Sequence, residues 1–204
     1  MVSAYPQLSE RARDAILPEV HQWALTNGLI MYPRNFTSEQ ATIAPTTLYP
    51  TLLPRSSVES VVSLQKAYNE LYARIIRGEN DDWLAKETVK LASYDTEFTG
   101  KLWSLYLKTK ELGTTQNLRL GIFRSDYLID KKNSQAKQVE FNTISVSFGG
   151  SSTKTGELHN YLNNSGKYCP DSGMPFYQTQ IPVSKSSSLL AKGIAEAQLL
   201  PGFK

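Results

Sequence analysis

The pattern of apolar residues changes near Leu118, from a helical period before it to strand-like patterning after it. Residues 8–27, 56–78, 81–92 and 96–110 carry apolar side chains three and four positions apart, which is typical of amphipathic helices. After Leu118 the chain instead shows short apolar runs bounded by turn residues. This order predicts a mixed α/β (α+β) fold in which a helical layer precedes the first strands.

Proline, glycine and serine mark where the predicted helices begin, bend and end. Pro18 interrupts the first helical pattern, so either the helix kinks there or two helices meet. Gly28 and Gly78 are stop signals for the first and second helices. Ser56 and Glu59 have the spacing of a capping box, which predicts the start of the second helix.

The chain is expected to divide into a helical N-terminal region, residues 1–113, and a second region, residues 114–204. Strands are predicted at about 118–130 and 137–147, joined by a turn at 131–134. The remaining predicted elements are a helix at about 151–163, a loop at 168–183 and a last helix at 186–198.

Composition excludes several classes of protein. With 40% apolar and 10% aromatic residues, the chain is too apolar to be disordered. A net charge of +3 gives no general electrostatic case for nucleic acid, and no apolar run approaches the roughly 18 residues that cross a bilayer. No secretory signal pattern precedes the first helix, and the single cysteine, Cys169, excludes an internal disulfide. We expect a soluble, non-secreted protein with no nucleic acid or membrane partner.

The most informative segment is the predicted strand that contains Glu140 and Asn142. Residues two apart in a strand face the same side, so these two side chains should lie about 7 Å apart while Val139 and Phe141 face the other side. A carboxylate beside an amide oxygen is a hard ligand pair that Mg²⁺ accepts when nucleotide phosphates complete its octahedron. The spacing leaves a solvated polar face as the alternative.

Arg124 stands in the other predicted strand, where its planar guanidinium could bind a substrate carboxylate through two hydrogen bonds. The alternative is a structural ion pair with Asp126 or Glu140. The two histidines, His21 and His159, lie in separate predicted helices without a neighbouring acid or second ligand, which favours surface or core packing over catalysis.

The residues just after the second strand could hold an anion. Ser145 and Ser147 offer hydroxyl groups, and the glycines at 149–150 offer unhindered backbone N–H groups at the start of a helix. A plain turn before the helix, with Ser151 and Ser152 as caps, explains the same residues.

Two strings of residues resemble a known family. Arg-Ser-Asp-Tyr at 124–127 and Val-Glu-Phe-Asn-Thr-Ile-Ser-Val-Ser-Phe-Gly-Gly at 139–150 resemble the eukaryotic-type glutathione synthetases, at the separation found in that family. The resemblance also covers the stretches 22–29, 48–55, 68–74 and 97–103, and spans about residues 5–165.

The resemblance implies an ATP-grasp ligase that joins γ-glutamylcysteine to glycine, with ATP as co-substrate and Mg²⁺ as cofactor, in a cytosolic homodimer. ATP would phosphorylate the cysteinyl carboxylate to an acyl phosphate, which the glycine amine attacks. By the same resemblance Arg124 binds substrate, Glu140 contacts ATP and Mg²⁺, and Asn142 is a second Mg²⁺ ligand. The γ-glutamylcysteine site is expected to be lined by Ile144, Ser145, Val146 and Ser147. No residue is assigned a catalytic role.

In the family, most ATP-grasp machinery follows the region that this sequence resembles, and residues 199–204 look unlike the family. We therefore expect a truncated product or a fragment of an incomplete synthetase fold. Two magnesium ligands without a third carboxylate or a lysine clamp predict negligible ligase activity for the 204 residues alone. The alternative is a non-catalytic module that pairs with an intact synthetase subunit.

Overall fold

The computed structural model describes residues 4–35, 37, 39–77, 82–113 and 118–202, and it confirms the mixed α/β class. Its helices and two small antiparallel sheets divide into two compact units. Unit 1 comprises 1–52 and 147–194, and unit 2 comprises 53–146 and 195–204. Within the described residues, no helix is long and apolar enough to cross a membrane.

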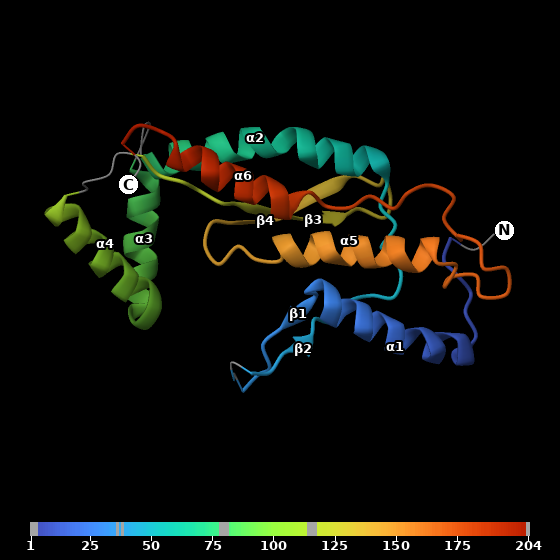
Figure 1. Ribbon diagram of the computed structural model, residues 1–204. Helices are drawn as coiled ribbons and strands as arrows, with labels where there is room; N and C mark the ends of the chain where they lie inside the picture. Colours follow the sequence, from blue (N-terminus) through green and yellow to red (C-terminus); the bar gives the residue numbers. More distant parts are fainter. Residues whose placement is uncertain (1–3, 36, 38, 78–81, 114–117, 203–204) are drawn as a thin grey trace. The chain divides into compact units, whose positions relative to one another are not determined.

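In unit 1 the first helix, α1, runs over Glu10–Asn27 (Figure 1). The Ser9 side chain caps its first turn, and Gly28 ends it at φ 76°, a left-handed conformation that glycine adopts without a steric penalty. Pro18 lies inside this single helix, so the alternative in which two helices meet at Pro18 is wrong. A small sheet follows, in which β1 (Ile30–Met31) pairs with β2 (Thr42–Ile43).

The core of unit 1 lies between α1 and α5, which runs over Gly149–Asn164. Figure 1 shows these two helices along one another. The core residues come from α1, α5 and the segments that follow each helix: Ile16, Val20, Ala24, Leu29, Leu158, Leu162 and Tyr168. Their burial is the main source of stability that the described part of unit 1 offers.

Polar side chains of α5 hold the segment that follows it. Asn160 and Asn163 each exchange two hydrogen bonds with backbone groups of Ile181 and Tyr177, at distances of 2.7 to 3.1 Å. The region 168–183 is turn and irregular structure, as predicted. Its backbone is therefore fixed by amide side chains, not by a helix or sheet.

His159 is a packed core residue, as its sequence context favoured. It is buried, and its Nε2 lies 2.8 Å from the carbonyl oxygen of Thr47. Burial lowers the pKa of the imidazole below its ordinary value of 6.5, and the hydrogen bond to Thr47 opposes this only in part.

Unit 1 should therefore lose stability as the pH falls through about 6.5 and below, because the unfolded chain binds a proton that the folded histidine resists. Urea unfolding at pH 7.5 and 5.5 measures this. His159→Gln, which keeps a hydrogen-bond donor for Thr47, should lose less stability between the two pH values than the parent chain. His21→Gln removes an exposed histidine and should behave as the parent does. An equal loss in parent and His159→Gln would contradict the prediction.

In unit 2 the long helix α2 runs over Arg55–Arg77, directly after Pro54. The predicted capping box is wrong, because the helix begins before Ser56 and Glu59 instead lies 3.9 Å from Arg55 as an ion pair. Proline is well suited to the position just ahead of a helix, since it needs no hydrogen bond there. The predicted stop at Gly78 lies outside the described residues.

The segment predicted as helices at 81–92 and 96–110 forms a helical hairpin. Helix α3 covers Trp83–Tyr94, a π-turn η1 covers Thr96–Gly100, and α4 covers Lys101–Leu112. The Asp95 carboxylate accepts hydrogen bonds from the backbone N–H groups of Phe98 and Thr99 in the π-turn, which explains where α3 stops. The last helix, α6, covers Ser186–Gln198, as predicted.

Candidate functional site

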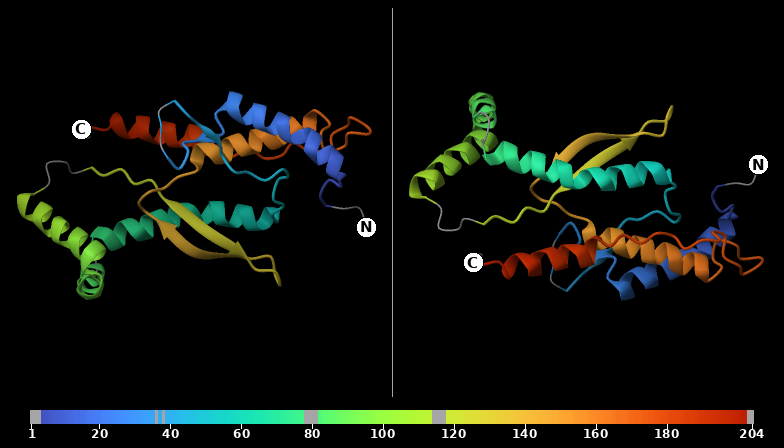
Figure 2. Two further views of the ribbon diagram at one scale, coloured as in Figure 1. Left: turned by 90° about the horizontal axis from the view of Figure 1, so that it is seen from below. Right: turned by 90° about the horizontal axis from the view of Figure 1, so that it is seen from above.

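The candidate site lies on the antiparallel hairpin of unit 2, formed by β3 (Arg124–Ile129) and β4 (Ala136–Asn142). Both strands are shorter than predicted at 118–130 and 137–147, and the turn between them is where the sequence placed it. Figure 2 shows the hairpin lying beside α2 in both views.

One side of the hairpin is anchored by aromatic rings. Phe141 of β4 stacks on Tyr72 of α2 with ring centroids 3.8 Å apart and an interplanar angle of 5°. Tyr68 and Phe123 lie beside the same ring at 6.4 and 5.3 Å. The hydroxyl of Ser57 donates to the backbone carbonyl of Ser134 at the hairpin turn. Helix α2 therefore fixes the orientation of the strand that carries Glu140.

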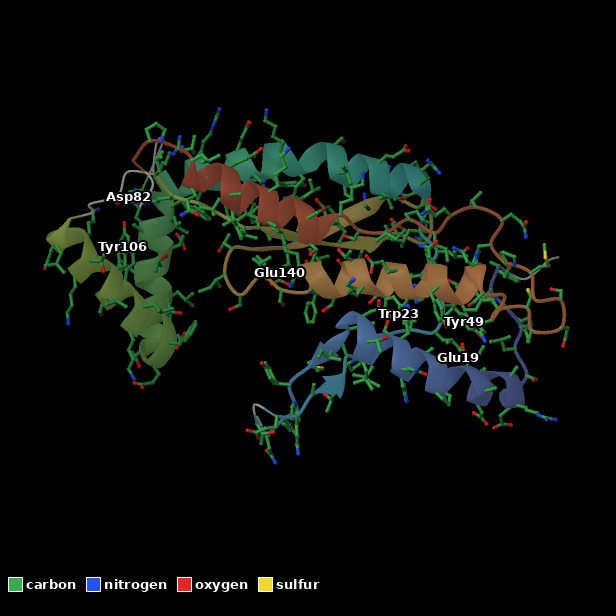
Figure 3. The ribbon with its side chains drawn as sticks, viewed as in Figure 1. Glu19, Trp23, Tyr49, Asp82, Tyr106 and Glu140 are labelled. Atoms are coloured by element: carbon green, nitrogen blue, oxygen red, sulfur yellow. The ribbon has the colours of Figure 1, made fainter. Side chains whose placement is uncertain are left out.

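The register places four polar side chains on the opposite side. Arg124 pairs with Asn142 and Asp126 pairs with Glu140 across the two strands. Because residues paired across an antiparallel ladder face the same side, and residues two apart do so as well, all four share one face. We call these four residues the polar face; Figure 3 labels Glu140 among them.

A β-bulge in β4 interrupts the alternation of side chains that the sequence predicted for this strand. The register shifts between Asp126 and Tyr127, because Glu140 opposes the first and Gln138 the second, which leaves Val139 without a partner. Val139 is 58% exposed and does not pack beside Phe141 as predicted. The bulge lies next to Glu140, where it interrupts the ladder, and pairing resumes at Tyr127 and Gln138.

Arg124 forms the structural ion pair that was the alternative to substrate binding. Its Nε and one terminal nitrogen donate to the two oxygens of Asp126 at 2.8 and 3.0 Å. These hydrogen bonds raise the pKa of Arg124 and lower the pKa of Asp126, and desolvation of the two groups opposes both shifts in part. The pair therefore stays charged into acidic solution. Asp126 was named from sequence only as a partner for Arg124; the structure makes it a member of the polar face.

The other two members keep their metal-binding oxygens available. Asn142 Nδ2 donates to Asp126 Oδ2 at 3.3 Å and to the carbonyl of Arg124 at 3.4 Å, which directs the amide oxygen away from that pair. Glu140 is exposed, and within the described residues its carboxylate has no hydrogen bond or ion pair. Its charge acts on Arg124 only through space.

The polar face fits part of a magnesium site. Mg²⁺ is usually held by one or two carboxylates, with waters and substrate phosphates filling its other positions. Glu140 and the Asn142 amide oxygen supply two hard ligands, whereas the oxygens of Asp126 are occupied by Arg124. Among the residues that the structure describes, no group of three or more histidine, cysteine or acidic side chains could hold a metal ion. A nucleotide would have to complete the coordination.

The predicted substrate-lining stretch follows β4 directly. Ile144 is 80% exposed, Ser145 has a positive φ of 53°, and Val146 is partly buried. A positive φ is uncommon for residues other than glycine and occurs often where function constrains the backbone. Ser147 begins the segment that belongs to unit 1.

The start of α5 corrects the interpretation of Ser151 and Ser152 as caps and leaves the anion-binding alternative a prediction. The helix begins at Gly149, with Phe148 at the N-cap position in a left-handed conformation of φ 70° and without a side-chain cap. Ser151 and Ser152 lie inside the first turn, so the reading of these serines as caps is wrong. A Cβ on Gly149 would lie 2.8 Å from Leu190 Cδ1, so a larger residue there would have to displace the end of that leucine side chain.

Comparison with solved structures defines the class of fold. The chain resembles a glutathione synthetase-like effector from Globodera pallida in its apo form, with a TM-score of 0.68 over 97% of this chain and 42% of that chain. At 21% identity this likeness shows the fold alone.

Sequence comparison then identifies the family. Residues 10–202 match the model of the eukaryotic glutathione synthase ATP-binding domain, so the chain belongs to the eukaryotic glutathione synthase family. It is 38% identical over 203 residues to the glutathione synthetase large chain of Schizosaccharomyces pombe and 30% identical over 201 residues to the glutathione synthetase of Homo sapiens. These matches cover 94% and 96% of this chain but only 38% and 40% of the relatives.

Proposed function

We propose that this chain forms part of a glutathione synthetase, a ligase that joins γ-glutamylcysteine to glycine at the expense of ATP. The family match over residues 10–202 supports this, as do the names of the relatives. The observation that carries it is the polar face, where the cross-strand register aligns Glu140 and Asn142 with an Arg124–Asp126 ion pair. The proposal includes the ATP-grasp architecture, a homodimeric enzyme and a cytosolic location.

In this proposal Glu140 binds ATP and Mg²⁺, and Asn142 is a second ligand of the metal. When bound, Mg²⁺ neutralises phosphate charge and polarises the bond that breaks during phosphoryl transfer. Asp126 positions both neighbours, since it accepts from Arg124 and from the Asn142 amide. Helix α2 holds the strand rigid through Phe141, so the two ligand oxygens keep their spacing.

Arg124 and residues 144–147 are proposed to bind γ-glutamylcysteine. Asp126 accepts hydrogen bonds from two nitrogens of the Arg124 guanidinium, which leaves the other N–H groups of the guanidinium for a substrate carboxylate. The exposed hydroxyls of Ser145 and Ser147 can hydrogen-bond the peptide groups of the substrate. The division into a helical region, 1–113, and a substrate and nucleotide region, 114–204, remains part of this proposal.

The 204-residue polypeptide should have negligible ligase activity by itself. The described residues supply two metal ligands and one ion-paired arginine, and the missing electrostatic stabilisation of the phosphoryl group is usually the largest catalytic term. ADP release in the presence of γ-glutamylcysteine, glycine and Mg·ATP tests this. Parent chain and Glu140→Ala should give the same background rate. Turnover of the parent well above that control would contradict the prediction.

A further inference from the structure

Two carboxylates lie directly opposite each other on the polar face. Asp126 of β3 pairs with Glu140 of β4 across the ladder, and side chains paired in this way have Cβ atoms about 4.5 to 5.5 Å apart. Like charges in such positions destabilise a sheet. Arg124 is the cation of the polar face, so one of the two negative charges remains without a counter-charge on that face. The arrangement therefore favours the binding of one further positive charge.

Arg124 has both carboxylates within reach. Asp126 stands two residues away on the same strand, and Glu140 lies diagonally across the ladder, where Cβ atoms are about 7 to 8 Å apart and a long side chain spans the gap. The guanidinium gives two donors to Asp126, at 2.8 and 3.0 Å. Glu140 acts on Arg124 through its charge. This choice of partner leaves Glu140 exposed and, among the described residues, without an ion pair.

Asp126 also fixes the amide of the polar face. Asn142 Nδ2 donates to Asp126 Oδ2 at 3.3 Å and to the backbone carbonyl of Arg124 at 3.4 Å, so the amide oxygen is turned away from both acceptors. One partly buried carboxylate thus determines where the cation lies and how the amide is turned. Outer partners of this kind orient metal ligands, and their loss typically costs about 10- to 100-fold in metal affinity.

We propose that Asp126 is a positioning residue that holds Arg124 away from Glu140 and thereby keeps the Glu140 carboxylate free for a divalent cation. The Arg124–Asp126 ion pair then sets the charge of the site as well as the orientation of its neighbours. The role of the cation rests on the proposed function, whereas the competition of two carboxylates for one arginine does not. Without Asp126, the guanidinium should form its charge-assisted hydrogen bonds with Glu140 instead.

The two partners of the ion pair should have opposite effects on metal binding. Asp126→Ala frees Arg124 to pair with Glu140, so a divalent cation should bind about 10-fold or more weakly. Arg124→Ala leaves two carboxylates and no cation, so binding should tighten by about threefold or more. The double variant Arg124→Ala/Asp126→Ala leaves Glu140 without a competitor and should bind within about threefold of the parent. All three variants keep the backbone carbonyl of residue 124 that accepts from Asn142.

Titration of the full 204-residue chain with Mn²⁺ tests the proposal, followed by NMR broadening of the backbone amide signals of residues 139–142. Mn²⁺ takes the same carboxylate and carbonyl ligands as Mg²⁺. Glu140→Ala is the positive control and should remove most of the broadening at these residues. Glu97→Ala is the matched control, because the Glu97 carboxylate also pairs with a cation, Lys101 at 2.6 Å, but lies outside the polar face. It should behave as the parent does.

A second NMR measurement needs no metal. In the parent chain, Glu140→Gln should move the Nε–H signal of Arg124 only slightly, because that group donates to Asp126. In the Asp126→Ala background the same change should move this signal much further, because the guanidinium then pairs with Glu140. The backbone spectra recorded alongside show that each variant is folded.

Three results would overturn the proposal. They are equal broadening in Asp126→Ala and the parent, a double variant that binds as weakly as Asp126→Ala, and an Nε–H signal in Asp126→Ala that does not respond to Glu140→Gln. The second is what a purely structural role of Asp126 in the hairpin predicts. A parent chain without Glu140-dependent broadening contradicts the metal role in the proposed function, and the Nε–H signal decides separately whether Asp126 holds Arg124 away from Glu140.

Discussion

Replacing Asn163 with leucine is expected to lower the free energy of unfolding of unit 1 by about 3 to 5 kcal/mol. Asn163 is 1% exposed, its Nδ2 donates to the carbonyl of Tyr177 at 2.9 Å, and its Oδ1 accepts from the N–H of Tyr177 at the same distance. Leucine has the same number of side-chain heavy atoms in the same branched arrangement, so the substitution leaves no cavity. It instead leaves the N–H and carbonyl groups of the half-buried Tyr177 without their side-chain partner, and an unpaired group costs about 1 to 3 kcal/mol where it stays shielded from water.

Urea unfolding followed by tryptophan and tyrosine fluorescence measures this loss. Asn164→Leu is the matched control, because that side chain is the next residue of α5 and is exposed. It should change the free energy of unfolding by no more than about 0.5 kcal/mol. If both variants unfolded at the same urea concentration as the parent, Asn163 would not hold the loop in the way that its hydrogen bonds indicate.

The sequence predicted those features that depend on local periodicity. The helices α1, α3, α5 and α6 begin and end within a few residues of their predicted bounds, because apolar spacing and glycine or proline signals are read from neighbouring residues. The proposed boundary near residue 113 stays a prediction, because the two compact units each draw on segments far apart in the chain.

Features that depend on distant partners could not be predicted in the same way. The bulge at Val139 exists because β4 slips by one residue against β3, and alternation within β4 alone contains no sign of it. The start of α2 is set by Pro54 ahead of the helix, while the serine and glutamate spacing suggested a capping box that does not form. The apolar line on α4 predicted a helix correctly but gave no information on whether the described chain covers it.

The candidate site shows the same division. Glu140 and Asn142 could be placed on one side of a strand from their spacing, whereas the cross-strand register that adds Arg124 and Asp126 to that side depends on the turn. The ion pair was one of two alternatives for Arg124, and the geometry shows that it forms, while substrate binding by the remaining N–H groups of Arg124 stays a prediction. The roles of Glu140, Asn142, Arg124 and the stretch 144–147 in ligand binding remain predictions, which substitutions on the polar face address.

In a full-length chimera in which this chain replaces the matched part of the Schizosaccharomyces pombe relative, substitution of Glu140 by glutamine should lower kcat/KM for ATP by about 100-fold or more. Glutamine keeps the size of the side chain and one of its oxygens but removes the negative charge. Of the two carboxylates on the polar face, Glu140 is the one without an ion-pair partner among the described residues. A weaker metal ligand should also raise the Mg²⁺ concentration needed for half-maximal activity, and added Mg²⁺ should recover part of the lost rate. Glu70→Gln on α2 is the matched control, since that exposed carboxylate pairs only loosely with Lys66 at 3.9 Å and lies outside the polar face. If Glu140→Gln and the parent had the same Mg²⁺ dependence, Glu140 would not be a ligand of the metal, whatever the effect on rate. A purely structural role for this exposed side chain predicts no change in the metal requirement.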